Sequence, residues 1–130
     1  MHYTPDMNDG QTIFVFGSNL AGRHGLGAAK DAARFWSAIY GKGNGPQGQA
    51  YAIPTKHSSL RTLPLERVKT YIDQFKEYAR RNPQLRFLVT EVGCGLAGFT
   101  ADDIAPLFAG VPDNCVLSGE FNRILRRSVE

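Results

Sequence analysis

Apolar residues recur along this chain with two different periods. Short apolar runs at residues 12–17, 49–53 and 86–92 have the length and composition of buried strands. Longer stretches at 27–40 and 64–81 repeat apolar residues every three or four positions, which is typical of amphipathic helices with one buried face. Strands that alternate with helices in this way indicate a mostly parallel sheet with helices on both of its faces.

The boundaries of these elements carry their own signals. Residues 41–48 contain four glycines and a proline, so we expect a loop without regular structure there, and we expect Pro54 to end the middle strand. The segment Thr100-Ala-Asp-Asp103 has the pattern of a capping box that opens a short helix. A fourth strand at 115–117 and a last helix at 121–127 complete the prediction.

Length and composition favour a single domain. With 130 residues, of which 42% are hydrophobic, the chain can bury a core without disulfide bonds. We predict one three-layer α/β/α domain with a mostly parallel mixed sheet over 1–130, with residues 1–10 as a loose arm. The sequence has no run of about 20 apolar residues and no signal-peptide pattern, so we expect no membrane partner. The two cysteines lack metal-ligand spacing, which favours free thiols in a reducing cytoplasm.

Two glycine-rich segments each stand between a predicted strand and a predicted helix. The first glycine loop covers residues 19–27, and the second glycine loop covers residues 93–98. Glycine lets backbone N–H groups approach an anion closely, and parallel strands end at the same edge of a sheet. Together the loops predict a cleft that holds a phosphate-bearing ligand from both sides. The candidate ligand-binding residues are Asn19, Gly22, His24, Gly25, Gly27, Thr55, Gly93, Cys94, Gly95, Leu96, Ala97 and Gly98.

Several of these candidates have a structural alternative. The Asn19 side chain can bond a sugar hydroxyl of the ligand, or it can cap its own turn. His24 can contact the ligand or face solvent. The second loop can approach a phosphate beside the helix that starts after Thr100, or its glycines can allow tight strand-to-helix packing. Cys94 has no histidine near it in sequence, which favours a small packed residue over a reactive thiolate.

Lys56 and Glu91 are the candidate catalytic residues. Lys56 follows the middle strand at the same sheet edge, where its amine can pair with phosphate, attack the anomeric carbon of a sugar, or remain an exposed loop charge. Glu91 shares a strand face with Phe87 and Val89, which predicts an inward-pointing carboxylate. The sequence has no NTPase phosphate-loop ending, no dinucleotide-binding acid and no metal-ligand cluster, so we expect no cofactor and no metal.

Three motifs follow one another over residues 12–108. They are Asn19-x-x-Gly22-x-x-Gly25-x-Gly27, Pro54-Thr55-Lys56 and Gly93-Cys94-Gly95. This ordered set resembles the macro domain, an ADP-ribose-binding α/β module. The similarity is greatest to the branch of DNA ADP-ribosyl glycohydrolase antitoxins and the terminal ADP-ribose protein glycohydrolase, and it extends to small phage and bacterial macro-like proteins.

The resemblance implies a role for each motif. It implies that the two glycine loops surround the diphosphate and the distal ribose, that Asn19 contacts this ribose, and that Lys56 lies by the anomeric carbon. Two features differ from that branch. Residues 96–98 stand where polar or acidic groups are common, and Ala97 replaces a catalytic aspartate of one such enzyme. The Gly-Asp-Ile/Val segment, whose aspartate contacts adenine in many macro domains, is missing.

Three functions follow from these patterns. The first is binding of ADP-ribose or a related nucleoside diphosphate by the two loops. The second is an ADP-ribosyl glycohydrolase that removes ADP-ribose from DNA or protein with Lys56, with Glu91 or a loop-end aspartate in place of the missing carboxylate. The third is a nucleic-acid-associated protein, because the net charge is +3 and arginines cluster at residues 80–86 and 123–127, although such clusters are also typical of a solvated face.

Overall fold

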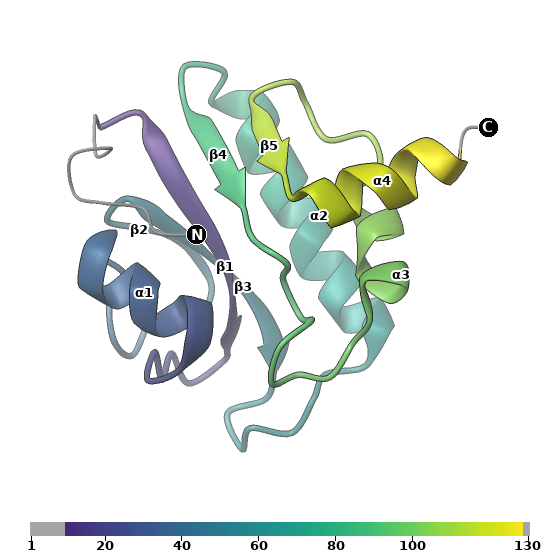
Figure 1. Ribbon diagram of the computed structural model, residues 1–130. Coiled ribbons are helices and arrows are strands. Elements are labelled where there is room, and N and C mark those ends of the chain that lie inside the picture. The colour runs from purple at the N-terminus through teal and green to yellow at the C-terminus, as the bar shows by residue number, and fades with distance from the viewer. Residues whose placement is uncertain (1–9, 129–130) are drawn as a thin grey trace.

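A mixed five-stranded sheet lies at the centre of the molecule (Figure 1). The structure, a computed structural model, describes residues 10–128, so residues 1–9 of the expected arm lie outside the described residues. The strands are β1 (Thr12–Asn19), β2 (Gly45–Gln47), β3 (Ala50–Lys56), β4 (Arg86–Val89) and β5 (Cys115–Leu117). They lie in the order β2-β3-β1-β4-β5, and every pair of neighbours is parallel except β2 and β3.

Helices cover both faces of this sheet, and the predicted three-layer α/β/α fold is confirmed. They are α1 (Gly27–Phe35), α2 (Leu65–Arg81), α3 (Ala101–Ile104), the short 3₁₀ helix η2 (Ala105–Phe108) and α4 (Gly119–Ser128). Figure 1 shows α1 on one side of the sheet and α2 on the other. Within residues 10–128, no helix has the length and apolar character needed to cross a membrane.

The alternation of side chains along β1 supplies two hydrophobic cores. Phe14 and Phe16 point to one face, where Trp36 stacks on Phe14 with ring centroids 5.4 Å apart. Ile13 and Val15 point to the other face and join the core under α2. Successive side chains of a strand point to opposite faces, so a central strand buried on both faces appears in the sequence as a continuous apolar run.

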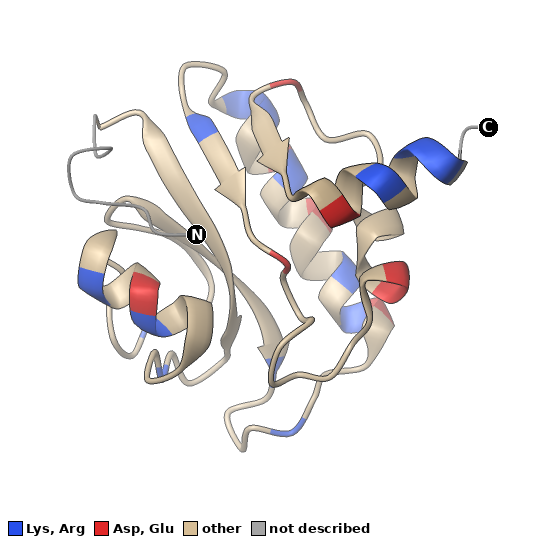
Figure 2. Ribbon diagram, viewed as in Figure 1, with Lys and Arg blue, Asp and Glu red and all other residues tan. Residues whose placement is uncertain are grey.

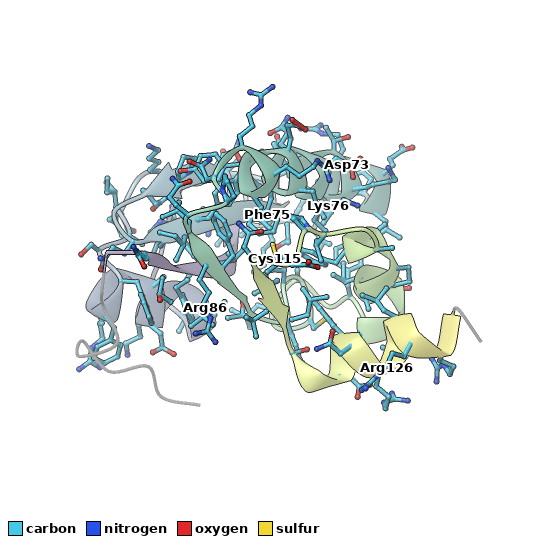
Figure 3. All side chains as sticks on the ribbon, turned by 90° about the horizontal axis from the view of Figure 1, so that it is seen from above. Asp73, Phe75, Lys76, Arg86, Cys115 and Arg126 are labelled. Carbon is cyan, nitrogen blue, oxygen red and sulfur yellow. The ribbon has the colours of Figure 1, made fainter. Side chains whose placement is uncertain are left out.

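The larger core lies between the sheet and the helices α2, η2 and α4. Phe75 of α2 is fully buried there, and its ring lies 5.3 Å from Phe87 of β4 and 6.3 Å from Phe108 of η2. Figure 3 shows Phe75 beneath α2. Phe108 in turn stacks on Phe121 of α4 at 5.7 Å. Each such burial contributes about 1.5–3 kcal/mol, so this cluster ties three helices to the sheet.

α1 ends at Phe35, earlier than the expected end at residue 40. Ser37 has a φ of +60°, the left-handed conformation that often ends a helix, and the N–H of Ala38 donates to the carbonyl of Ala32 at 3.1 Å. This turn directs the chain away from the helix axis. As a consequence Tyr40, which lies beyond it, is exposed.

Two expectations at the edge of the sheet were wrong. Residues 45–47 form β2 inside the predicted loop, because an edge strand tolerates a proline such as Pro46. β3 continues through Pro54 to Lys56. On the β2 side of β3, pairing involves only residues 50–52. Pro54 lies beyond this pairing, so its missing N–H removes no hydrogen bond between β2 and β3.

Candidate ligand-binding site

The order of the strands produces a crevice beside β1. From β1 the chain passes through α1 on one face and returns as β3, and from β3 it passes through α2 on the other face and returns as β4. Loops that leave neighbouring strands toward opposite faces open a crevice at the carboxyl ends of the strands. A cavity of about 510 Å³ lies there. Its lining residues are Gly17, Ser18, Asn19, Arg23, Gly25, Leu26, Gly27, Ala28, Ala29, Tyr40, Thr55, Lys56, Leu60, Thr90, Glu91, Gly93, Cys94, Gly95, Leu96 and Ala97.

This cavity brings both glycine loops and the end of β3 together. The predicted site residues are all in the lining except three, which are Gly22, His24 and Gly98. The sheet therefore places the three motifs at one site, as the shared sheet edge predicted. What each lining residue contributes follows from its local geometry.

Asn19 braces the first glycine loop. Its Oδ1 accepts from the N–H of Arg23 at 3.0 Å, and its Nδ2 donates to the carbonyl of Arg23 at 3.1 Å. Both polar atoms of the side chain are thereby used to close the turn, which is the structural alternative for this residue. Nδ2 carries a second hydrogen, so the amide keeps one donor that it can offer to the cavity.

Gly22 and His24 hold the loop from behind the cavity. Gly22 has a φ of +72°, and a Cβ there would overlap the backbone of Gly41 and Lys42. His24 is only 4% exposed, and its ring lies edge-on to Phe16 at 5.2 Å. The alternative that His24 faces solvent was wrong, because this apolar contact buries its ring. His24 does not line the cavity, and its contact with a ligand stays a prediction.

The amino end of α1 opens on the cavity without a cap. Leu26 occupies the N-cap position, no side chain bonds to the first turn, and that turn has no acidic residue. The first N–H groups of a helix have no partner within it, which leaves those of Gly27, Ala28 and Ala29 available. All three residues line the cavity. The helix thus presents hydrogen-bond donors and partial positive charge to an anion in the cavity.

The amino end of α3, in contrast, is satisfied by its own side chains. Thr100 Oγ1 accepts from the N–H of Asp103 at 3.2 Å, and the Asp103 carboxylate accepts from the N–H of Thr100 at 3.0 Å. The predicted capping box is present, but neither of its residues lines the cavity. The cavity lining therefore does not include the helix end that was expected beside a phosphate at the second glycine loop, and that contact stays a prediction.

The second glycine loop packs closely against β1. A Cβ on Gly17 would lie 3.2 Å from the backbone N of Gly93, so the absence of a side chain at Gly17 lets the loop approach β1 closely. Thr62 Oγ1 donates to the carbonyl of Ala97 at 2.8 Å and ties the loop to the segment after β3. Within residues 10–128, the N–H groups of residues 95–97 have no recorded backbone partner. These groups are free to donate to a ligand.

A β-bulge at the ends of β1 and β3 positions Lys56. Ser18 pairs with Pro54, but the register then shifts and Asn19 pairs with Lys56. The extra residue, Thr55, is buried and its Oγ1 donates to the carbonyl of Ser18 at 3.2 Å. The Lys56 side chain is half-buried and lines the cavity.

Three charged side chains line the cavity, and they are Arg23, Lys56 and Glu91. In the described part of the chain, none of the three has a recorded ion pair. Glu91 is exposed, because β4 ends at Val89 and strand alternation no longer applies two residues further on. The expected inward orientation of Glu91 was wrong, but the residue lines the cavity. Figure 2 shows an acidic position in the segment that follows β4.

Cys94 is a partly buried residue of the second glycine loop. Its Sγ lies 3.6 Å from the carbonyl of Val92, and it packs against the larger core. Burial, with the negative charges of Glu91 and Asp103, raises the pKa of the Cys94 thiol to about 11. At neutral pH the side chain is therefore a thiol, as expected for a packed residue and not for a nucleophile. Over residues 10–128, no cluster of three potential metal ligands is present.

Several lining residues were not among the sequence candidates. Arg23 and Leu26 lie within the first glycine loop, but only its glycines, Asn19 and His24 were selected. Tyr40 was assigned to a helix that ends before it. Leu60 is a single large apolar residue in the polar segment 56–62, and this isolation was a signal in the sequence that it has a special position.

The arginine clusters form a surface of mixed charge. Figure 2 shows basic and acidic positions interspersed on α2 and α4. The ion pairs there, with distances of 2.6–3.5 Å, are Arg80–Glu77, Arg81–Glu77, Arg123–Glu120 and Arg127–Asp102. Figure 3 shows Arg86 and Arg126 on the side of the molecule away from α2. This arrangement lacks the continuous positive surface that binding to a nucleic-acid backbone favours.

Known proteins resemble this chain in structure and not in sequence. No protein-family model and no curated protein matches the sequence. A solved structure, Thermosipho africanus DarTG in complex with ADP-ribose, matches with a TM-score of 0.62 and 16% sequence identity over 85% of this chain. The fold is macro domain-like. The match covers 38% of the DarTG chain, so the present chain spans less than half the length of that protein.

The macro domain-like fold agrees with the family resemblance of the three motifs. Both arguments rest on different observations, because the motifs are short and the structural match has low sequence identity. In this fold the three motifs lie at the end of β1 and the loop after it, in the last residues of β3, and in the loop after β4, and all three contribute residues to the cavity lining.

Proposed function

We propose that this protein binds ADP-ribose or a related nucleoside diphosphate in the cavity beside β1. The observation that carries the proposal is the lining itself: the uncapped amino end of α1 and the bare backbone of the second glycine loop face one cavity. Two N–H-rich walls suit a diphosphate, which carries negative charge on both phosphates. The cavity volume of about 510 Å³ falls within the range of small-molecule sites, roughly 300–1,000 Å³.

The magnitudes show why both walls are needed. A helix amino end stabilises an anion by about 0.3–1 kcal/mol, and by about 2 kcal/mol in a partly buried site. Micromolar affinity requires about 8 kcal/mol. The remainder must come from the N–H groups of both loops, from the cations of Arg23 and Lys56, and from apolar contact. The proposal is further supported by the structural neighbour, DarTG, which was solved in complex with ADP-ribose.

Two glycines allow a direct test of the backbone contacts. At Gly25 and Gly95 an added Cβ would meet nothing within 4 Å, so both alanine variants should fold normally. Each methyl group would hold a diphosphate away from the loop. A hydrogen bond to a charged group is worth about 1.5–3 kcal/mol, so calorimetry should show about 10- to 150-fold weaker ADP-ribose binding in Gly25→Ala and in Gly95→Ala.

Gly119 provides the matched control. It also has open space around its Cβ position, but it begins α4 and does not line the cavity. Gly119→Ala should therefore bind ADP-ribose as the wild type does. The proposal is refuted if the wild type binds neither ADP-ribose nor ADP, or if both loop variants bind with wild-type affinity.

A second candidate function is hydrolysis of ADP-ribose linkages on DNA or protein. It is favoured by the presence of Lys56 and Glu91 in one cavity lining. In this reaction Lys56 Nζ attacks the anomeric carbon as the bond to DNA or protein breaks, and Glu91 gives a proton to the leaving group. Water then hydrolyses the bond between Lys56 and the sugar, which releases ADP-ribose and restores both side chains. The wild type should release ADP-ribose from ADP-ribosylated DNA and protein. Lys56→Ala should still bind free ADP-ribose but should release none from these substrates. Intact substrates after incubation with the wild type would leave binding as the function.

A further inference from the structure

The mouth of the cavity gathers large apolar side chains that the fold leaves exposed. Within residues 10–128, the exposed large hydrophobic residues are Leu26, Ile39, Tyr40, Leu60, Leu65, Leu96 and Val116. Four of these seven, namely Leu26, Tyr40, Leu60 and Leu96, line the cavity, and we call them the apolar mouth. Single exposed apolar residues are normal, but their concentration at one concave site marks a binding surface.

Tyr40 lies at the apolar mouth, where its ring contacts a buried histidine. It is 69% exposed, and its ring meets that of His24 edge-on at 6.3 Å. His24 Nε2 lies 3.0 Å from the carbonyl of Lys42 and 3.2 Å from Gln47 Oε1, so this nitrogen carries the proton and donates. Gln47 Oε1 itself accepts from the N–H of Ile39 at 2.8 Å. His24 is thus a positioning residue that fixes the Tyr40 ring.

The apolar mouth is continuous with the anion-binding end of α1. Leu26 is the N-cap residue, directly before the free N–H groups of Gly27 and Ala28. A ligand whose phosphate lies at this helix end therefore has apolar side chains beside the phosphate. Such a ligand combines negative charge with a flat apolar group, and a nucleotide has both.

The mouth has few groups that could read the hydrogen-bonding edge of a base. Apart from Tyr40 and Cys94, the polar side chains of the cavity lining are Ser18, Asn19, Arg23, Thr55, Lys56, Thr90 and Glu91. The hydroxyls of Ser18, Thr55 and Thr90 donate to backbone carbonyls, and the cations of Arg23 and Lys56 are the groups that suit the diphosphate. Both polar atoms of Asn19 bond to the backbone of Arg23, which leaves this amide a single free donor. Glu91 follows β4, whereas Leu26 and Tyr40 belong to the segment between β1 and β3.

We propose that the apolar mouth holds the nucleobase of the ligand by stacking on Tyr40 and by van der Waals contact, so that the site accepts nucleoside diphosphates irrespective of their base. This inference rests on the proposed function and names its substrate class. Stacking tolerates any base because every base has a π-face, whereas hydrogen bonds to base edges discriminate. A site that stacks on the base and forms no hydrogen bonds to its edge should therefore bind nucleotides with any base.

Calorimetry with ADP, GDP, CDP and UDP tests this proposal, with inorganic pyrophosphate as a probe that lacks a base. The wild type should bind the four nucleotides with affinities within about tenfold of one another. Base–aromatic stacking is worth about 1–3 kcal/mol, so Tyr40→Ala should weaken all four by about 5- to 150-fold and leave pyrophosphate binding unchanged. Tyr40→Phe retains the ring and should retain the affinities.

Ile39→Ala is the matched control, because Ile39 is 51% exposed beside Tyr40 but does not line the cavity. It should bind all four nucleotides normally, and thermal unfolding should show that every variant is folded. A preference of 100-fold or more for one base, or unchanged nucleotide affinity in Tyr40→Ala, overturns the inference and leaves the proposed function intact. Absence of binding by pyrophosphate and by all four nucleotides overturns both.

Discussion

Substitution of Asn19 can distinguish a structural role of its side chain from direct contact with the ligand. Its amide makes two hydrogen bonds to the backbone of Arg23, at 3.0 and 3.1 Å, and these stabilise the turn at the start of the first glycine loop. The substitution Asn19→Ala removes both bonds. The N–H and carbonyl of Arg23 then turn to water, and the loop loses its connection to the end of β1.

The magnitude of this loss follows from the two bonds. Each contributes about 1 kcal/mol net, which gives about 2 kcal/mol together. We therefore expect the Tm of Asn19→Ala to fall by roughly 5–10 °C. If the loop is disordered in the free variant, the ligand must order it on binding, and 2 kcal/mol corresponds to about 30-fold weaker ADP-ribose binding.

The assay pairs thermal unfolding with calorimetry on the same variants. Asn19→Asp keeps the acceptor oxygen and loses the donor, so it should lose about half as much stability. Its added negative charge lies in the cavity lining and should weaken ADP-ribose binding more than the stability loss explains. A wild-type Tm for Asn19→Ala together with lost ADP-ribose binding would refute the bracing role and assign Asn19 to direct ligand contact.

Three further outcomes are expected elsewhere in the chain. Gly22→Ala should lower the Tm far more than Gly25→Ala, because Gly22 has a φ of +72° and a Cβ there would overlap the neighbouring backbone. Thermal unfolding followed by circular dichroism measures both Tm values, and equal values would contradict this expectation. Thr100→Ala should cost about 1 kcal/mol in urea unfolding without changing ADP-ribose affinity, because its capping box lies outside the cavity. The pKa of the Cys94 thiol is raised to about 11, so iodoacetamide should alkylate it over ~100-fold more slowly at pH 7 than an unperturbed thiol. The rate of alkylation should increase with pH up to that pKa. Fast labelling at pH 7, measured by mass spectrometry, would contradict this expectation.

The periodic elements could be predicted because their burial follows from sequence alone. In α2, Val68, Ile72, Phe75 and Ala79 are all fully buried, as their helical spacing indicates. The central strand β1 is buried on both faces, and its continuous apolar run indicated this. For such elements local pattern and tertiary packing agree, so a pattern is sufficient.

The ends of elements depended on tertiary contacts that no local pattern contains. The helical spacing continues to Ile39, yet α1 ends where Ser37 takes a left-handed turn. β2 forms at residues 45–47 only because the edge of β3 is available to it. The burial of His24 likewise depends on Phe16, which lies on another element. Each of these misses affects the site, since together they place the Tyr40 ring at the cavity.

The glycines show most clearly what the sequence could and could not supply. Their number and placement indicated a ligand cleft, but a glycine can serve the fold or the ligand, and composition does not distinguish the two. At Gly17, Gly43 and Gly93, a side chain would press on neighbouring backbone or core, so these positions let the loops and strands pass one another. At Gly25 and Gly95 there is open space, and both line the cavity. Because the fold does not require glycine at these two positions, their alanine variants test the proposed site with the least effect on the fold.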